Sequence, residues 1–202
     1  VREKIEVASN RGLEASKLEE AWQHLYRGQC NDAYWHGMFG GVYLPNLREA
    51  IYRNLIRAEA IADEKVLAGK AVIERDFDYD GRNELILETR ELSAYVDPWE
   101  GGNVFELDWK EGTHNFADTL SQPWEAYHDK IGNPPIDWYR RTLFRDHIFR
   151  REDDAKSLYE RKPFIDAGDF TVEPFEVVEK TDEPGVLLRR KGRNWSSNVT
   201  LV

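Results

Sequence analysis

The hydrophobic pattern of this 202-residue chain changes its period once, near residue 67, from that of an α-helix to that of a β-strand. Before this point apolar residues recur every three or four positions, which places them on one face of a helix. After it they alternate within short runs that Gly, Pro, Asp and Asn separate, as in strands joined by turns. Helices that precede strands, rather than alternate with them, predict an α+β fold of two domains.

Two stretches of the first third predict amphipathic helices, residues 16–29 and residues 46–62. In the first, Ser16 and Glu19 have the spacing of a capping box. In the second, Pro45 suits the first turn, where its missing N–H costs no hydrogen bond. Both stretches carry apolar residues at helical spacing, namely Leu18, Ala21, Trp22, Leu25 and Tyr26, and Leu47, Ala50, Ile51, Leu55, Ala58, Ile61 and Ala62.

Residues 1–10 predict a further helix, which Gly12 would end, so residues 1–66 are expected to form a small three-helix-bundle-like domain. Residues 67–202 are expected to form a β-sandwich domain, because most of their apolar runs have the length and alternation of strands. Residues 124–130 predict one helical insertion. The predicted strands are residues 71–73, 85–89, 92–96, 104–109, 171–179 and 186–190.

Composition excludes several classes of protein. An apolar content of 41% with 12% aromatic residues is typical of a folded domain and not of a disordered chain. No apolar run approaches the roughly 20 residues that span a bilayer. The one cysteine, Cys30, leaves no intrachain disulfide or multi-cysteine zinc site, and it is expected to pack in the interior. A reducing compartment, and so a cytoplasmic location, fits this cysteine content.

The net charge of −10 comes almost entirely from the second part of the chain. Residues 1–65 carry 9 basic and 10 acidic residues, and the remainder carries 19 basic and 28 acidic residues. Such an excess of negative charge disfavours nucleic acid as the main partner. This negative charge neither favours nor disfavours a neutral ligand such as a sugar.

The stretch between the two stronger helices combines the residue types that bind sugars. Asn31, Asp32, Tyr34, Trp35 and His36 stand beside three glycines within residues 31–41. An aromatic ring packs on the apolar face of a pyranose, while carboxylate, amide and imidazole groups bond its hydroxyls. In the alternative interpretation the stretch is a helix–helix corner whose aromatic residues fill the core. Composition by itself favours this alternative.

The run from Gln29 to Glu59, QCNDAYWHGMFGGVYLPNLREAIYRNLIRAE, resembles the last signature region of family 57 glycoside hydrolases. The similarity is to the branch that contains 4-α-glucanotransferases and α-amylases. Further on, ELSAYVDPWEGGNVFELDW, DTLSQPWEAYH and RRTLFRDHIF resemble the carboxyl-terminal sandwich of the same branch. The resemblance covers nearly the whole chain and fades after about Arg190.

This resemblance implies an architecture of an incomplete β/α barrel, a three-helix middle domain and a sandwich similar to that of galactose mutarotase. The chain would hold the middle domain and the first part of the sandwich. It also implies retaining cleavage of α-1,4-glucosidic bonds by two barrel carboxylates about 5–5.5 Å apart. The barrel motifs are not found in these residues, so the chain is expected to hold no catalytic residue, to need no cofactor and to be inactive alone.

By matching position to motif, Asp32, Trp35 and His36 should face the sugar site, and Asn31 and Tyr34 should support them. The expected partners are a maltooligosaccharide or longer α-glucan and an upstream barrel of the parent chain, and neither nucleic acid nor membrane is expected. A homo-oligomer is an open alternative, because a sandwich without all its strands exposes sheet edges. The competing function is a non-catalytic carbohydrate-binding or domain-assembly module.

A second candidate site lies in the acidic run from residue 76 to residue 84. Asp76, Asp78, Asp80 and Glu84 could surround a structural calcium ion with oxygen ligands, and Gly81 would permit the sharp turn. The run is no EF-hand, because its twelfth position is a leucine and not a glutamate. The alternative is an acidic hairpin turn, which Asp and Gly favour in any case.

Overall fold

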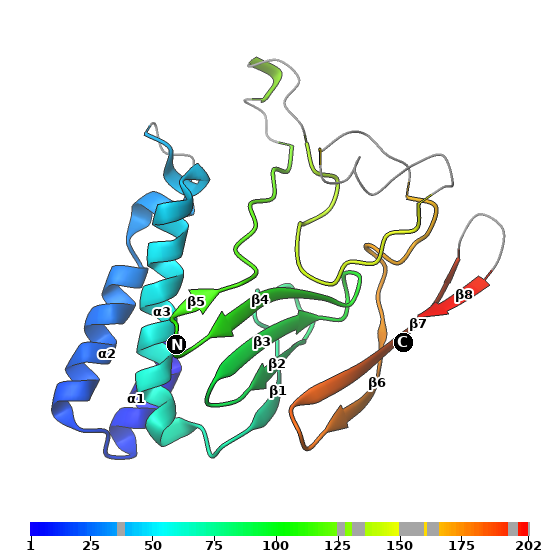
Figure 1. Cartoon of the computed structure of the whole chain (residues 1–202). Helices are drawn as coiled ribbons and strands as arrows, with labels where there is room; N and C mark the ends of the chain where they lie inside the picture. The colour runs from blue at the N-terminus through cyan, green and yellow to red at the C-terminus, as the bar shows by residue number, and fades with distance from the viewer. Residues whose placement is uncertain are drawn as a thin grey trace.

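In the computed structural model, residues 1–35, 39–124, 128–130, 136–149, 160, 166–193 and 198–201 are described. Over these ranges three α-helices precede two antiparallel sheets, as Figure 1 shows, so the fold is α+β. The helices are α1 (Arg2–Asn10), α2 (Ala15–Gly28) and α3 (Pro45–Val66). Two short 3-10 helices, η1 (Asn31–Tyr34) and η2 (Gly41–Tyr43), lie between α2 and α3.

The three helices pack on one apolar core, in which small alanines let the helices approach closely. Its buried members are Ile5, Ala8, Leu13, Ala21, Leu25, Ala58, Ile61 and Ala62. All three helix predictions are confirmed, but the capping box is wrong. Helix α2 begins one residue earlier, Glu14 is its N-cap, and the Ser16 hydroxyl donates to the Glu14 carboxylate at 2.7 Å. Ser16 therefore lies inside the first turn, where it cannot cap the helix.

Helix α3 has 22 residues, enough to cross a bilayer, yet charged side chains recur along its length. None of the helices in the described ranges is apolar enough over such a length to span a membrane.

The first sheet has five strands in the order β1-β2-β3-β4-β5, each antiparallel to the next. They are β1 (Ala71–Arg75), β2 (Glu84–Glu88), β3 (Leu92–Asp97), β4 (Asn103–Trp109) and β5 (His114–Asn115). Strand β1 forms one edge, and among the described residues no strand pairs with its outer side. Self-association through an exposed sheet edge stays a prediction.

The second sheet has three strands, β6 (Glu176–Thr181), β7 (Gly185–Arg193) and β8 (Asn198–Leu201). The strand predicted over 171–179 is wrong in its first half. Pro174 has no N–H for a ladder, and Phe170 and Phe175 are both buried as anchors of an irregular segment. The helix predicted over 124–130 is a 3-10 helix, η3 (His128–Lys130), and residues 125–127 lie outside the described ranges.

The segment before β6 attaches the second sheet to the first. The Phe175 N–H donates to the Pro98 carbonyl at 2.7 Å, and the Gly101 N–H donates to the Glu173 carbonyl at 3.1 Å. Gly101 has a φ of 76°, and a Cβ there would stand 2.2 Å from the Thr171 carbonyl oxygen. Only glycine allows this close approach.

A buried ion network joins the helices to the first sheet. The Lys4 ammonium group of α1 lies 2.6 Å from Glu59 and 3.0 Å from Asp63, both of α3, and also contacts Glu88 of β2. Lys110, directly after β4, lies 2.6 Å from Asp63. All five side chains are at least four-fifths buried, so each charge depends on the others for the solvation that water would otherwise supply.

Candidate functional site

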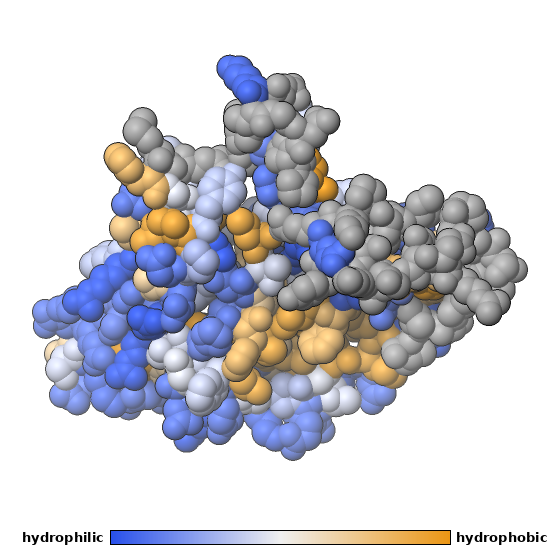
Figure 2. Space-filling view, turned by 45° about the horizontal axis from the view of Figure 1, so that its top comes forward, coloured by the Kyte–Doolittle hydropathy of each residue, from blue (hydrophilic) through white to orange (hydrophobic). Residues whose placement is uncertain are grey.

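The predicted sugar-binding residues lie at the tips of α2 and α3, where η1 and η2 connect these helices. Asn31, Asp32, Tyr34 and Trp35 are all exposed, whereas the Ala33 side chain between them is buried. His36, the fifth predicted residue, lies outside the described residues. Figure 2 shows hydrophobic side chains at the surface near these tips, in contrast to the mostly hydrophilic surface of the helices below them.

The aromatic residues of this corner do not fill a core. Tyr34 is 58% exposed, Trp35 is 51% exposed and Phe39 is 91% exposed. Their exposure contradicts the interpretation in which the corner is an apolar filler. Cys30, expected to pack, is exposed as well. The binding role of the corner itself stays a prediction.

Several bonds fix the backbone of the corner. The Tyr34 hydroxyl donates to the Gly28 carbonyl at 2.6 Å, and the Val42 N–H donates to the Trp35 carbonyl at 3.0 Å. Arg48 donates to the Val42 carbonyl at 2.6 Å and pairs with Asp118 at 2.7 Å. The corner therefore holds exposed aromatic rings on a fixed backbone, which suits a binding surface.

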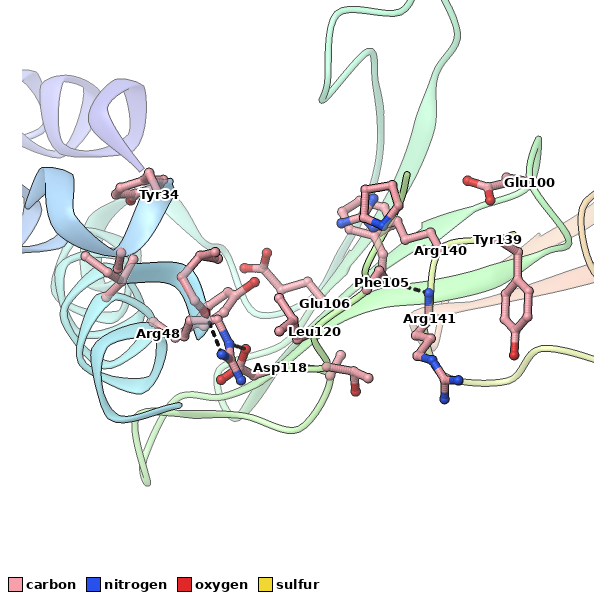
Figure 3. Close-up of a pocket in the computed structure, with 18 of the residues that line it drawn as sticks. Tyr34, Arg48, Glu100, Phe105, Glu106, Asp118, Leu120, Tyr139, Arg140 and Arg141 are labelled. Atoms are coloured by element: carbon pink, nitrogen blue, oxygen red, sulfur yellow. Dashed lines mark hydrogen bonds and ion pairs between the residues drawn. The ribbon is translucent and has the colours of Figure 1, made fainter. Parts of the chain in front are cut away.

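A pocket of about 850 Å³ opens between the helices and the first sheet, and we call it the junction pocket (Figure 3). Of the predicted site residues only Tyr34 lines it. Its walls come from η1, α3, β4 and the segments on either side of residues 125–135. Its aromatic and charged lining residues are Tyr34, Tyr52, Phe105, Trp138 and Tyr139, and Arg48, Glu100, Glu106, Asp118, Arg140 and Arg141.

Sequence reasoning missed an acidic pair, of which Glu106 lines this pocket. Glu106 and Asp108 are two positions apart on β4 and so lie on one face of the strand. Burial raises the pKa of Glu106 to about 7. Burial, and after it the neighbouring Glu106 carboxylate, raise the pKa of Asp108 to about 10. With pKa values raised in this way, the pair of carboxyl groups retains a proton near neutral pH.

The signal for this pair was present in the sequence. A strand that reads Phe105-Glu106-Leu107-Asp108 places two acids on one face and two apolar residues on the other. What the pattern could not show was that Glu106 lines a pocket whose other wall includes Tyr52 of α3. The Asp108 side chain is 1% exposed, and its Oδ1 has no hydrogen-bond partner in the described part of the chain.

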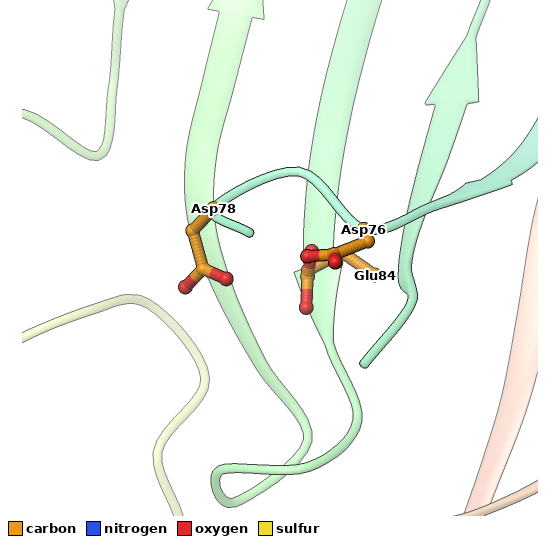
Figure 4. A group of neighbouring side chains, drawn as sticks. All are labelled: Asp76, Asp78 and Glu84. Carbon is orange, nitrogen blue, oxygen red and sulfur yellow. The ribbon is translucent and has the colours of Figure 1, made fainter. Parts of the chain in front are cut away.

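Three of the four predicted metal ligands come together in the loop between β1 and β2. Figure 4 shows Asp76, Asp78 and Glu84 there, and one oxygen of each lies within 4.8 Å of the others. Asp80 is not part of this group, because its carboxylate turns back to accept the Arg82 N–H at 2.8 Å. Carboxylate oxygens so close together could hold a hard divalent cation.

The backbone of this loop bends to bring the carboxylates together. The φ angles of Tyr79 and Gly81 are 64° and 91°, both in the left-handed region. The Phe77 N–H donates to Glu84 at 2.6 Å, and the Gly81 N–H donates to Asp76 at 3.1 Å. Burial, and with it the nearby carboxylate of Asp78, raises the pKa of Glu84.

A cluster around His147 joins two segments of the chain. His147 lies 2.9 Å from Asp166, and the Thr171 hydroxyl donates to the same carboxylate at 2.5 Å. Burial opposes ionisation of Asp166, yet these bonds outweigh it and lower the pKa of the carboxyl. The Thr171 hydroxyl and the His147 ring are thus both bound to the Asp166 carboxylate, which makes His147 a structural tie between these segments.

Comparison with known families gives matches over nearly the whole chain. Residues 1–62 match the middle domain of the α-amylase/4-α-glucanotransferase family, and residues 76–136 and 132–202 match its C-terminal model. The 4-α-glucanotransferase of Thermococcus litoralis is 32% identical over 203 residues, which cover 86% of this chain. The α-amylase 1 of Dictyoglomus thermophilum is 43% identical over 113 residues, 56% of this chain and 16% of that enzyme.

The fold is similar as well. The crystal structure of the 4-α-glucanotransferase from Thermococcus litoralis aligns with a TM-score of 0.76 at 34% identity, over 90% of this chain and 28% of that one. The chain spans 29% of the length of the Thermococcus litoralis relative that it matches in sequence. By these matches in sequence and fold, the chain belongs to the α-amylase/4-α-glucanotransferase family, family 57 of the glycoside hydrolases.

Proposed function

We propose that this chain is part of a retaining enzyme that acts on α-1,4-glucans, a 4-α-glucanotransferase or an α-amylase, and that it supplies substrate-binding residues. The observation that carries the proposal is the η1 corner, where Tyr34 and Trp35 are half exposed on a fixed backbone beside Asp32. The relatives are named as these two activities, which supports the assignment of the substrate.

We assign the catalytic carboxylates to a barrel upstream of these residues in the parent protein. A retaining enzyme needs its two carboxyl groups about 5–5.5 Å apart, with the sugar between them. Glu106 and Asp108 are two positions apart on one strand, and Asp108 is buried, so they cannot stand on either side of a sugar. The bound substrate would then meet Asp32, Trp35 and His36 from this chain and the catalytic pair from the barrel.

We also propose that residues 1–66 form the helical middle domain and that residues 67–202 form the start of a sandwich similar to that of galactose mutarotase. The end of α3 at Val66 and the beginning of β1 at Ala71 support this division. Two antiparallel sheets joined through the Phe175 segment support the sandwich.

Trp35→Ala tests the sugar-binding role. Loss of a stacking platform costs about 1–3 kcal/mol by comparison with other stacked aromatic rings, so kcat/KM on maltooligosaccharides should fall by roughly 5-fold to 150-fold in the full-length enzyme. Asp32→Asn, which keeps the size and removes the charge, should also lower it. Trp109→Ala removes a ring that is 40% exposed on β4 and serves as the control. Unchanged kinetics in a folded Trp35→Ala variant would exclude the role.

We further propose that Asp76, Asp78 and Glu84 hold a calcium ion. The Oδ1 atom of Asp76 is buried and has no partner in the described part of the chain, which leaves it available to a cation. A ligand that binds only the folded state stabilises it by about 2.7 kcal/mol at one hundred times its Kd, so millimolar calcium should raise Tm by several degrees. Asp78→Asn should remove this increase. Asp80→Asn should keep it, and its loss there as well would contradict the assignment.

A further inference from the structure

The junction pocket contains polar side chains that the protein itself does not satisfy. Both Tyr52 and Arg140 line it, and among the described residues neither the Tyr52 hydroxyl nor the Arg140 guanidinium has a hydrogen-bond or ion-pair partner. Arg140 instead lies over the Phe105 ring, 5.0 Å from its centroid. Tyr52 is half-buried and Arg140 is exposed, so both donors are accessible to a ligand in the pocket.

These open groups face one another across the pocket. Tyr52, Glu106 and Arg140 all line the pocket. Figure 3 shows Glu106 between Tyr34 and Arg48 on the helical side and Arg140 on the sheet side. They come from α3, β4 and the segment after residue 135, which only the tertiary fold brings together.

The charges around the pocket are largely neutralised in pairs. Arg48 pairs with Asp118 at 2.7 Å, and Arg141 pairs with Asp137 at 2.7 Å. Glu100 pairs with Arg145 at 3.0 Å. A pocket with balanced charge has no preference for an ion of either sign, which favours a neutral ligand with many hydroxyl groups.

The walls of the pocket also expose aromatic rings, and its volume suits a small molecule. Tyr34 is 58% exposed and Trp138 is 54% exposed, so each ring has a face open to a ligand. Such faces pack against the apolar side of a sugar ring. A volume of about 850 Å³ lies within the range of about 300–1,000 Å³ that is typical of small-molecule sites.

We propose that the junction pocket binds a glucosyl segment of the α-glucan, as an extension of the η1 corner through Tyr34. The inference rests on the proposed function, because it takes the same neutral glucan as its ligand. Tyr52 and Arg140 donate hydrogen bonds to sugar hydroxyls, and Glu106 accepts one. Tyr34 and Trp138 pack on the rings.

Hydrogen exchange and calorimetry on the full-length protein test this site, with a thio-linked maltooligosaccharide that glycosidases do not cleave. Backbone amides in residues 105–108 and 138–141 should exchange more slowly with the ligand present. Tyr52→Phe and Arg140→Gln should each raise Kd at least fivefold. Tyr52→Phe removes no hydrogen bond within the described residues, so it should keep the Tm of the parent protein. Arg140→Gln removes the contact with the Phe105 ring, so its Tm is measured beside its Kd.

Matched controls separate the pocket from the rest of the surface. Tyr26→Phe changes an exposed hydroxyl on α2, and Arg53→Gln changes an exposed arginine on α3, so both should leave Kd unchanged. If Trp35→Ala weakens binding while both pocket variants bind normally and residues 105–108 are not protected, the pocket proposal is overturned and the proposed function stands. If none of these variants changes Kd, the proposed sugar-binding function fails as well.

Discussion

Replacement of Lys4 by Met is expected to lower the free energy of unfolding by about 3–5 kcal/mol, the cost of leaving buried charges without their partner. Lys4 contacts Glu59, Asp63 and Glu88, whose side chains are 3–6% exposed. Met has a similar length and fills the same space, so the loss comes from electrostatics and not from a cavity. After the change, Lys110 alone would balance three carboxylates.

The expected result is a fall in Tm of about 10 °C or more for a domain pair of this size. Lys17→Met is the matched control. Its ammonium pairs with Glu64 at 2.5 Å, but both side chains are more than 40% exposed, and such pairs contribute about 1 kcal/mol or less. A Lys4→Met variant no less stable than the control would show that the network is solvated in solution.

The pH dependence of this network has a defined sign. Burial opposes the charge of Lys4, yet the three carboxylates outweigh it and raise the pKa of its ammonium group. The stabilisation by Lys4 is therefore complete below the unfolded pKa near 10.5 and is lost only as the pH rises above it. Despite burial, Lys4 holds the pKa of Glu59 below 4.5. The stabilisation that the ionised Glu59 contributes is therefore lost as the pH falls through the acidic range.

Asp108→Asn is expected to stabilise the protein at pH 8. Burial and the Glu106 carboxylate raise the pKa of Asp108 from 3.8 to about 10, so the folded state keeps a proton that the unfolded chain releases. A raised carboxyl pKa makes stability fall as the pH rises from about 4 toward 10. Asparagine avoids this loss, since it is neutral at every pH and its amide can still donate to Glu106.

The gain should be at most about 6 kcal/mol at pH 8, since about four pH units separate pH 8 from the unfolded pKa of 3.8 and each corresponds to about 1.4 kcal/mol, and it should disappear near pH 4. Chemical unfolding at both pH values measures it. Asp182→Asn changes an exposed carboxylate and serves as the control, with no gain at either pH. An Asp108→Asn variant whose stability is the same at pH 8, or whose gain persists at pH 4, would rule out the retained proton.

The sequence by itself determined the elements and their order. Periodicity of apolar residues located all three helices and four strands of the first sheet to within a few residues, because side chains on one face of a helix or strand must share one environment. It failed over 171–179, where a run of strand-like composition contains Pro174 and is held by two buried phenylalanines. The signature from Gln29 to Glu59 was sufficient to indicate the family.

Only the tertiary structure decided which side chains meet. Lys4 and Lys110 reach the same carboxylate although more than a hundred positions separate them. The junction pocket combines Tyr52, Glu106 and Arg140 from three elements. In the acidic loop, the turn at Tyr79 and Gly81 directs Asp80 away from the other ligands. Burial, pKa and hydrogen bonding of a side chain depend on its neighbours in space. The order of residues along the chain does not give the distances between side chains in the fold.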